Sequence, residues 1–275
     1  MSNKSNKPDK TYVPLSMDTI SKGDKFGPIK FSVKRSIYEK TMLHLKNSYF
    51  YEQKINDNSI LLPSDIWGAA RVLSSAQAGY GQINEALIRR SNWRIYGCGF
   101  AEEELFAETE IMNIKMINNI PSAQFKTVTR NRKGRVLLES IDELLLLHRV
   151  KFDYKENYTE LKKNDYNYHQ KVKGTFRHNV WEDWANNIHN DKFGKEHGFK
   201  QGILEFPTYI NWIFQSLDAS KKYKLFEINL KNILPIYNND ILNIYGRDIS
   251  PSMSEVYGCL DSNNAIRFSA RVKYL

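Results

Sequence analysis

The sequence predicts an α+β fold built from two similar units, each with one long helix packed on an antiparallel sheet. A helix followed by a run of strands occurs twice, and matching points, such as Pro63 with Pro207 and Gly134 with Asn264, are about 130–144 residues apart. A polar, charged segment that is poor in aliphatic residues, 154–173, lies just past the middle of the chain. A linker between two halves would lie there.

The first half carries one long predicted helix and then four strands. The helix begins at Leu62-Pro63, because proline suits the first helical turn, where its missing N–H would have no partner anyway. Gly79 and Gly81 end it. Apolar side chains at helical spacing form one face: Ile66, Ala69, Ala70, Leu73 and Ala76. The predicted strands cover 93–100, 104–117, 123–131 and 134–150.

The second half repeats this order. Phe206-Pro207 opens a second helix, and its apolar face consists of Tyr209, Ile210, Ile213, Phe214 and Leu217. The strands that follow cover 224–237, 240–249, 253–261 and 265–275. Residues that tolerate positive φ mark hairpin turns at Asn131–Gly134 and Asp261–Asn264.

These elements predict four segments along the chain. We expect a polar N-terminal arm over 1–14, an N-terminal unit over 15–153, a linker over 154–173 and a C-terminal unit over 174–275.

Composition and charge limit the function classes. The chain has 40 Lys+Arg against 31 Asp+Glu, and its net charge of +9 at pH 7 favours acidic partners. Nucleic-acid binding is not expected, because no reading helix or aromatic and basic platform is recognisable. No apolar run approaches the roughly 18 residues of a membrane helix. The polar start has no secretory signal, so we expect a cytoplasmic protein. Cys98 and Cys259 form no metal-type pair, and no cofactor motif is present.

The segment Trp181–Thr208, WEDWANNIHNDKFGKEHGFKQGILEFPT, lies directly before the second helix. It resembles a segment of the MaoC-like hydratases and dehydratases, hotdog-fold proteins that carry Gly-Asp-x-Asn-Pro-x-His-x-Asp and then Phe-Ala-Lys-x-x-Gly-Phe. The positions similar to these two parts are Asn186, Ile188, His189, Asp191, Phe193, Gly194, Lys195, Gly198 and Phe199. Gly202, Ile203 and Leu204 then lead into the helix, as in that family.

The resemblance implies a double hotdog, in which one half keeps the catalytic segment and the other shapes an acyl tunnel. Here the C-terminal unit carries the segment, and the first half has no equivalent. The implied substrate is an acyl thioester of coenzyme A or of an acyl carrier protein, in fatty-acid or polyketide metabolism. The implied reaction is the reversible dehydration of a 3-hydroxyacyl thioester. It needs no metal or cofactor, and a homodimer of such chains fits the same family.

The sequence departs from the family at positions that matter for the reaction. The family's acid, an aspartate five residues before the histidine, is Trp184 here, with Asp183 one place earlier. The family's His-Gly at the helix start, where a backbone N–H meets the thioester oxygen, is replaced by Glu205-Phe206. Pro207 follows and has no N–H to offer.

His189 is the predicted general base, because the ordinary pKa of histidine suits proton transfer near neutral pH. Asp183 or Glu205 is the predicted acid. Four further residues are predicted to bind the substrate: Asn186, Gly202, Phe206 and Trp184. Structural roles stay open as alternatives. His189 would then hydrogen-bond within its own loop, Asp183 would be solvated, and Glu205 would place a favourable charge at a helix N-terminus.

A second hypothesis is a protein that binds an acyl thioester without hydro-lyase activity. The replacements at Trp184 and Phe206 would then have removed the dehydratase reaction while the pocket was kept. A repurposed enzyme, such as a thioesterase or a catalyst of a cyclising addition, lies between the two hypotheses. Thioester binding without turnover would favour the second.

Overall fold

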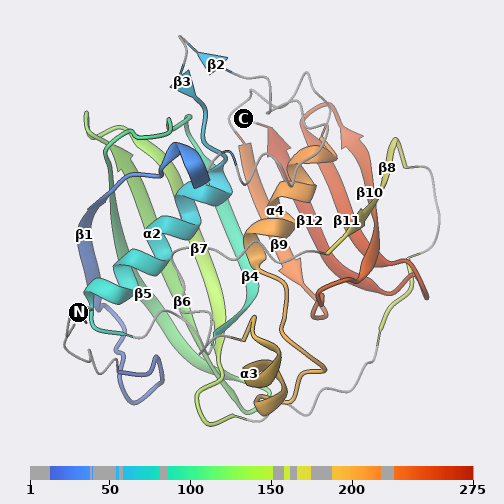
Figure 1. Cartoon of the computed structure of the whole chain (residues 1–275), viewed down its shortest axis with the longest axis horizontal. Coiled ribbons are helices and arrows are strands. Elements are labelled where there is room, and N and C mark those ends of the chain that lie inside the picture. Colours follow the sequence, from blue (N-terminus) through green and yellow to red (C-terminus); the bar gives the residue numbers. More distant parts are fainter. Residues whose placement is uncertain are drawn as a thin grey trace, which may run out of the picture.

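Ten strands form a single antiparallel sheet, and two helices lie side by side on one of its faces (Figure 1). The computed structural model describes residues 13–37, 39, 54–55, 58–80, 86–150, 158–161, 166–174, 188–217 and 226–274. The helices are α2 (Pro63–Gln77) and α4 (Phe206–Gln215), and the short α3 (Asp191–Glu196) precedes α4. Both long helices have proline in the first turn, which confirms the predicted starts.

The strands divide into two sets with the same internal order. The N-terminal set is β1 (Lys25–Phe31), β4 (Ala86–Ile95), β5 (Leu105–Ile117), β6 (Ile120–Asn131) and β7 (Val136–Leu146). The C-terminal set is β8 (Tyr168–Lys173), β9 (Phe226–Asn232), β10 (Ile241–Ser250), β11 (Met253–Leu260) and β12 (Ile266–Tyr274). A separate pair, β2 (Lys54–Ile55) and β3 (Asn58–Ser59), lies outside the main sheet.

The sheet order is β1-β5-β6-β7-β4-β9-β12-β11-β10-β8. From the middle of the sheet outward, each half begins with the first strand that follows its helix. The other three strands that follow the helix come next, in reverse order, and the strand that precedes the helix lies at the outer edge. The predicted repeat of one helix with an antiparallel sheet is visible in this order. Both predicted hairpin turns are present, with positive φ at Gly134 and Asn264.

Strand β8 lies within 154–173, the segment predicted to be a linker. Its burial alternates between half-buried and exposed side chains, and it pairs with β10 at the outer edge of the sheet. Exposed lysines such as Lys171 and Lys173 are typical of edge strands, because their charge discourages pairing with other chains. This polar composition is the reason why the strand resembles a linker in sequence. The domain boundaries themselves stay a prediction.

The two halves meet where β4 pairs with β9, in a register that joins Arg90 to Lys231 and Ile95 to Phe226. Side chains add to this junction. The Asn232 amide donates to the Ile88 carbonyl at 2.6 Å. On the helix side, the Ser64 hydroxyl of α2 donates to the side-chain amide oxygen of Asn211 in α4, also at 2.6 Å. The sheet and the helix layer are therefore both continuous across the middle of the molecule.

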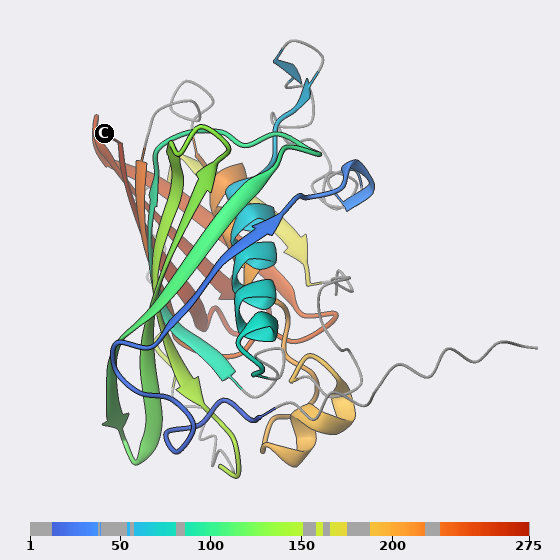
Figure 2. The ribbon, with the colours of Figure 1, turned by 90° about the vertical axis from the view of Figure 1, so that its left-hand side faces the viewer.

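A buried aromatic cluster packs between the helices and the sheet at this junction. Trp93 of β4 is fully buried, and its ring centroid lies 5.6 Å from that of Trp67 in α2 and 6.2 Å from that of Phe206 in α4. Trp67 and Phe206 are 5.2 Å apart. One hydrophobic core contains all three residues and extends into both halves. Figure 2 shows the sheet curving around α2 on this side.

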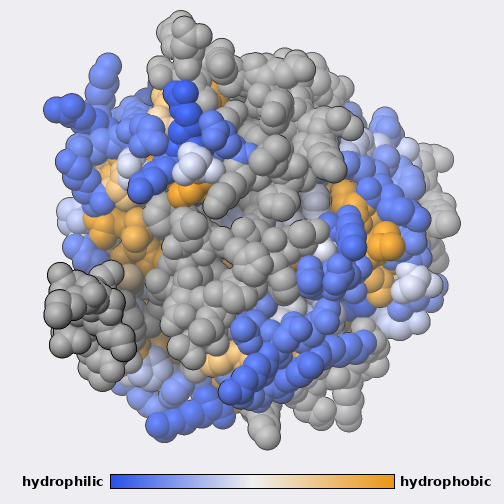
Figure 3. Space-filling view, viewed as in Figure 1, coloured by the Kyte–Doolittle hydropathy of each residue, from blue (hydrophilic) through white to orange (hydrophobic). Residues whose placement is uncertain are grey.

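Hydrophilic side chains cover most of the described surface on the helix-bearing face, with smaller hydrophobic areas between them (Figure 3). Among the described residues, no helix is long and apolar enough to cross a membrane.

Replacing Trp93 should destabilise the whole molecule, because its ring contacts both helices. We expect Trp93→Ala to lower the free energy of unfolding by about 3–5 kcal/mol, as for other buried aromatic truncations. Met116→Ala, at a side chain 54% exposed, is the control and should change it by about 0.5 kcal/mol or less. Urea titration measures both. A small effect at Trp93 would contradict a shared core.

Candidate functional site

A cavity of about 80 Å³ lies between the two halves, beside the start of α4. Its walls come from α2, from the beginning of β4, from the segment before α4 and from the first turn of α4. The lining residues are Trp67, Gly68, Arg71, Val72, Ala86, Leu87, Ile88, Leu144, Ile188, His189, Ile203, Leu204, Phe206, Pro207, Tyr209 and Asn232. A second cavity of about 250 Å³ adjoins it, since both share Leu87, Ile88, Ile203, Tyr209 and Asn232. Most of these side chains are apolar, which is typical of small-molecule sites.

His189 reaches this cavity from a short segment that is bonded to the residues before α4. The Ile203 N–H donates to the Ile188 carbonyl at 2.9 Å. The His189 Nδ1 lies 2.5 Å from the Ile203 carbonyl oxygen. A carbonyl oxygen only accepts, so Nδ1 carries the ring proton and Nε2 is the nitrogen that can take up another.

Burial sets the protonation state of His189. The desolvated ring has a pKa below its usual value, and the negative charge of Glu205 and the bond to Ile203 only partly oppose this effect. The ring is therefore neutral at neutral pH, which is the state that a general base needs.

Glu205 is the predicted acid that the structure brings close to His189. It is 2% exposed, lies directly before α4 and makes no capping hydrogen bond to that helix. Its charge acts on His189, but Glu205 is not among the residues that line the cavity. This position suits a group that holds or polarises the histidine ring.

Asn190, Asp191 and Gly202 hold the segment that carries His189. The Asn190 side chain caps α3 by accepting the N–H groups of Lys192 and Phe193, and the Asp191 carboxylate accepts the Gly202 N–H at 2.9 Å. A Cβ on Gly202 would lie 2.0 Å from the His189 carbonyl oxygen. Gly202, predicted to bind substrate, is absent from the cavity lining and packs against the histidine backbone instead.

Of the other residues predicted for the site, one lines the cavity and three lie outside the described residues. Phe206 lines the cavity and is nearly buried. Pro207 also lines it, and the Thr208 N–H donates to the Glu205 carbonyl at 3.1 Å, so the first turn of α4 has few N–H groups to offer a ligand. Asp183, Trp184 and Asn186 lie outside the described residues.

A buried polar pair between α2 and β7 was not predicted from the sequence. Asp142 on β7 is fully buried and accepts hydrogen bonds from Trp67, Ser91 and Ser140. Arg71, one turn after Trp67 on α2, lines the cavity and places its Nε 3.9 Å from the Asp142 carboxylate. An arginine within the small-residue run of the first helix was the available signal, because charged side chains are rare at buried positions.

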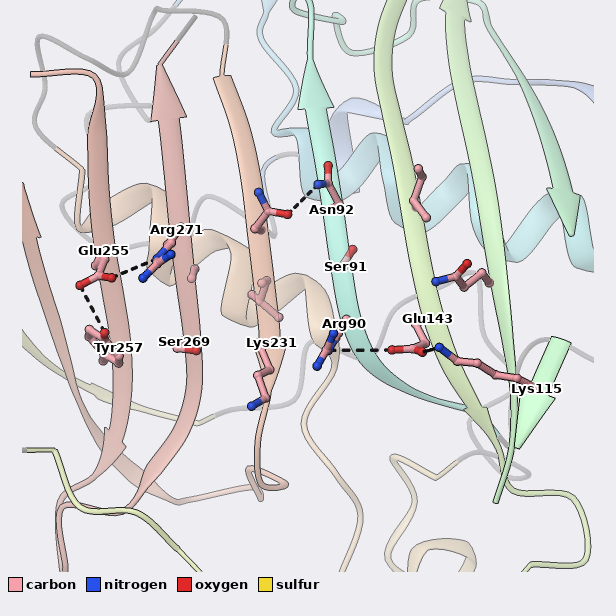
Figure 4. A pocket seen from close by; sticks show the side chains of 15 residues that line it. Arg90, Ser91, Asn92, Lys115, Glu143, Lys231, Glu255, Tyr257, Ser269 and Arg271 are labelled. Atoms are coloured by element: carbon pink, nitrogen blue, oxygen red, sulfur yellow. Dashed lines mark hydrogen bonds and ion pairs between the residues drawn. The ribbon is translucent and has the colours of Figure 1, made fainter. Parts of the chain in front are cut away.

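The opposite face of the sheet carries a shallow hollow of about 520 Å³ (Figure 4). Charged side chains from both halves surround it. Arg90 lies beside Lys231 across the junction, and Glu143 binds Lys115 at 2.7 Å. These side chains belong to the outer face of the strands, away from α2, α4 and His189.

Known structures resemble this chain, although their sequences differ from it. A MaoC-like dehydratase from Phytophthora capsici matches with a TM-score of 0.66 at 11% identity, over 93% of this chain and 96% of that one. A conserved hypothetical protein from Mycobacterium tuberculosis, described as a double hotdog fold, gives 0.62 at 12% identity, over 94% and 98%. An acyl-ACP thioesterase from Bacteroides thetaiotaomicron gives 0.58 at 10% identity, over 91% and 98%.

The matches span nearly the whole chain and include both half-sheets. The chain has the double hotdog fold. The predicted fold class is confirmed by this likeness, which at such low identity establishes the fold alone. No protein-family model and no curated protein sequence matches the chain. The candidate site is built on the cavity that residues of both units line.

Replacing Gly202 should displace the segment that carries His189. A methyl group there meets backbone on the opposite side, so we expect Gly202→Ala to cost about 1–3 kcal/mol of stability. Gly97→Ala is the control, since a Cβ at that position has only ordinary contacts at 3.5 Å. Thermal unfolding compares the two variants. Equal stability would mean that the segment adapts without cost.

The lowered pKa of His189 should make stability fall in mild acid. The unfolded chain binds a proton near pH 6.5, whereas the folded chain binds it only at lower pH, so acidification favours unfolding. The stabilisation is complete above about pH 6.5 and decreases below it. In His189→Gln this part of the pH dependence should disappear. Urea titrations between about pH 7.5 and 5.5 measure it, and identical slopes would refute the assignment.

Proposed function

We propose that this protein acts on an acyl thioester, and that its reaction is the reversible dehydration of a 3-hydroxyacyl thioester. One observation carries this proposal. His189, neutral and with Nε2 as its basic atom, lines an apolar cavity beside the first turn of a central hotdog helix. The similarity of the fold to that of a MaoC-like dehydratase supports the same reaction class.

In the proposed reaction, His189 Nε2 removes a proton from the α-carbon of the substrate. The electron pair forms the double bond as the bond between the β-carbon and its hydroxyl breaks, and the hydroxyl leaves as water after it gains a proton. Asp183 stays the proposed proton donor. Glu205 is proposed to orient His189, because it is buried near the ring and does not line the cavity. The reverse steps hydrate an enoyl thioester.

The N-terminal unit is proposed to hold the acyl chain. Four residues of α2 line the cavity together with Ala86 and Leu144, whereas His189 comes from the C-terminal unit. The thioester carrier is proposed to be coenzyme A or an acyl carrier protein, to which the net positive charge is suited. A cytoplasmic location and a homodimer stay predictions.

Binding without hydro-lyase activity is the second candidate function. Proline at position 207 and the engaged Thr208 N–H leave the first turn of α4 poor in donors for a thioester oxygen. Such donors stabilise the charge that develops on that oxygen in the transition state. A thioesterase is a further variant of this hypothesis, since an acyl-ACP thioesterase has a similar fold.

The test is loss of enoyl-thioester absorbance with short and medium trans-2-enoyl substrates. We expect turnover by the wild type and a loss of about 100-fold or more in His189→Ala, because general bases contribute at this level. His197→Gln is the control, since His197 lies at the end of α3 and does not line the cavity. Absence of turnover with tight thioester binding would favour the second candidate, and release of free thiol would favour a thioesterase.

A further inference from the structure

Arg71 is a buried cation whose hydrogen-bonding capacity is unused. Its side chain is 2% exposed, and within the described part of the chain Nε, Nη1 and Nη2 have no hydrogen-bond partner. Its guanidinium lies over the ring of Phe125, with 4.5 Å between the central carbon and the ring centroid. Stacking stabilises the charge but accepts none of its N–H groups. A buried polar group without a partner requires a specific explanation.

Asp142 balances the charge of Arg71 but accepts no hydrogen bond from its guanidinium. The carboxylate already accepts hydrogen bonds from Trp67, Ser91 and Ser140, and the Nε of Arg71 lies 3.9 Å from its nearer oxygen. At this distance the two groups form an ion pair, but they are too far apart for a hydrogen bond. Arginine stays charged even though burial lowers its pKa, because that pKa starts so high. The site therefore keeps a cation with several donors and no acceptor.

The location of Arg71 connects it with the proposed reaction. Arg71 and His189 line the same cavity, Arg71 from the N-terminal unit and His189 from the C-terminal unit. Most of the other lining side chains are apolar, with Trp67, Leu144 and Ile188 among them. A ligand held in this cavity therefore meets the imidazole of His189, apolar side chains and one cationic side chain, that of Arg71.

We propose that the cavity selects an acyl group that ends in a carboxylate, which binds Arg71 while the thioester lies at His189. This inference rests on the proposed function and adds the substrate class. A carboxylate presents two oxygens in the geometry of the guanidinium fork, whereas a hydroxyl presents one.

The first test measures affinity and is independent of turnover. Saturated coenzyme A thioesters are compared in matched pairs that end in methyl or carboxylate: butyryl with succinyl, hexanoyl with adipyl, and octanoyl with suberyl. In isothermal calorimetry we expect the wild type to bind the carboxylate member of at least one pair about tenfold more tightly or better, as hydrogen bonds to a charged group permit. Equal affinity in every pair overturns this proposal and leaves the proposed function intact. Absence of binding by all six thioesters overturns both.

Two variants assign the preference to Arg71. Arg71→Met keeps an unbranched side chain without the charge and should abolish the preference, whereas Arg71→Lys should keep part of it as a point charge. If Arg71→Met does not fold because Asp142 is left unpaired, the double variant Arg71→Met/Asp142→Asn removes both charges. Arg90→Met is the matched control, because Arg90 lies on the outer face of the sheet (Figure 4) with its side chain 57% exposed. Retention of the preference in the folded Met variant overturns the proposal.

Discussion

The pairing of β4 with β9 is the interaction on which the rest of this structure depends. It joins two half-sheets edge to edge, removes one exposed edge from each and places α2 beside α4. The aromatic cluster of Trp67, Trp93 and Phe206 fills the space that this arrangement creates. The cavity exists because the same junction brings α2 and the first turn of α4 to one place.

Local backbone contacts then determine the chemistry of the site. Residues 188–190, which include His189, lie in no helix or strand and are held by the bonds to Ile203 and by the close approach of Gly202. The protonated Nδ1 and the lowered pKa of the ring follow from these contacts and from burial. A short stretch of chain outside the helices and strands thus presents a neutral imidazole to an apolar cavity.

Much of the fold was predictable from sequence because its signals are local. Proline at both helix starts, the apolar helix faces and the residues of the hairpin turns each depend on neighbours in the chain. Strand β8 was not predictable, since its polar side chains are those of a sheet edge and the edge is defined only by tertiary structure. In the site, His189 was singled out by its resemblance to the family motif, and Glu205 was named as a candidate acid because it lies at the start of the second helix. The ion pair of Arg71 with Asp142 joins residues far apart in sequence, and no local pattern predicts which residue is the partner of Arg71.

Fusion of the two hotdog units in one polypeptide has a consequence for how the halves can diverge. In a symmetric pair of identical subunits, every substitution occurs twice and must be tolerated at both places. Here Arg71 follows Pro63 at the spacing at which Gln215 follows Pro207, so the two helices differ at matching positions. A substitution in one half therefore leaves the matching position of the other half unchanged. A ligand that binds to both Arg71 and His189, as proposed, would therefore bind once per chain, where an equivalent symmetric dimer would contain two such sites.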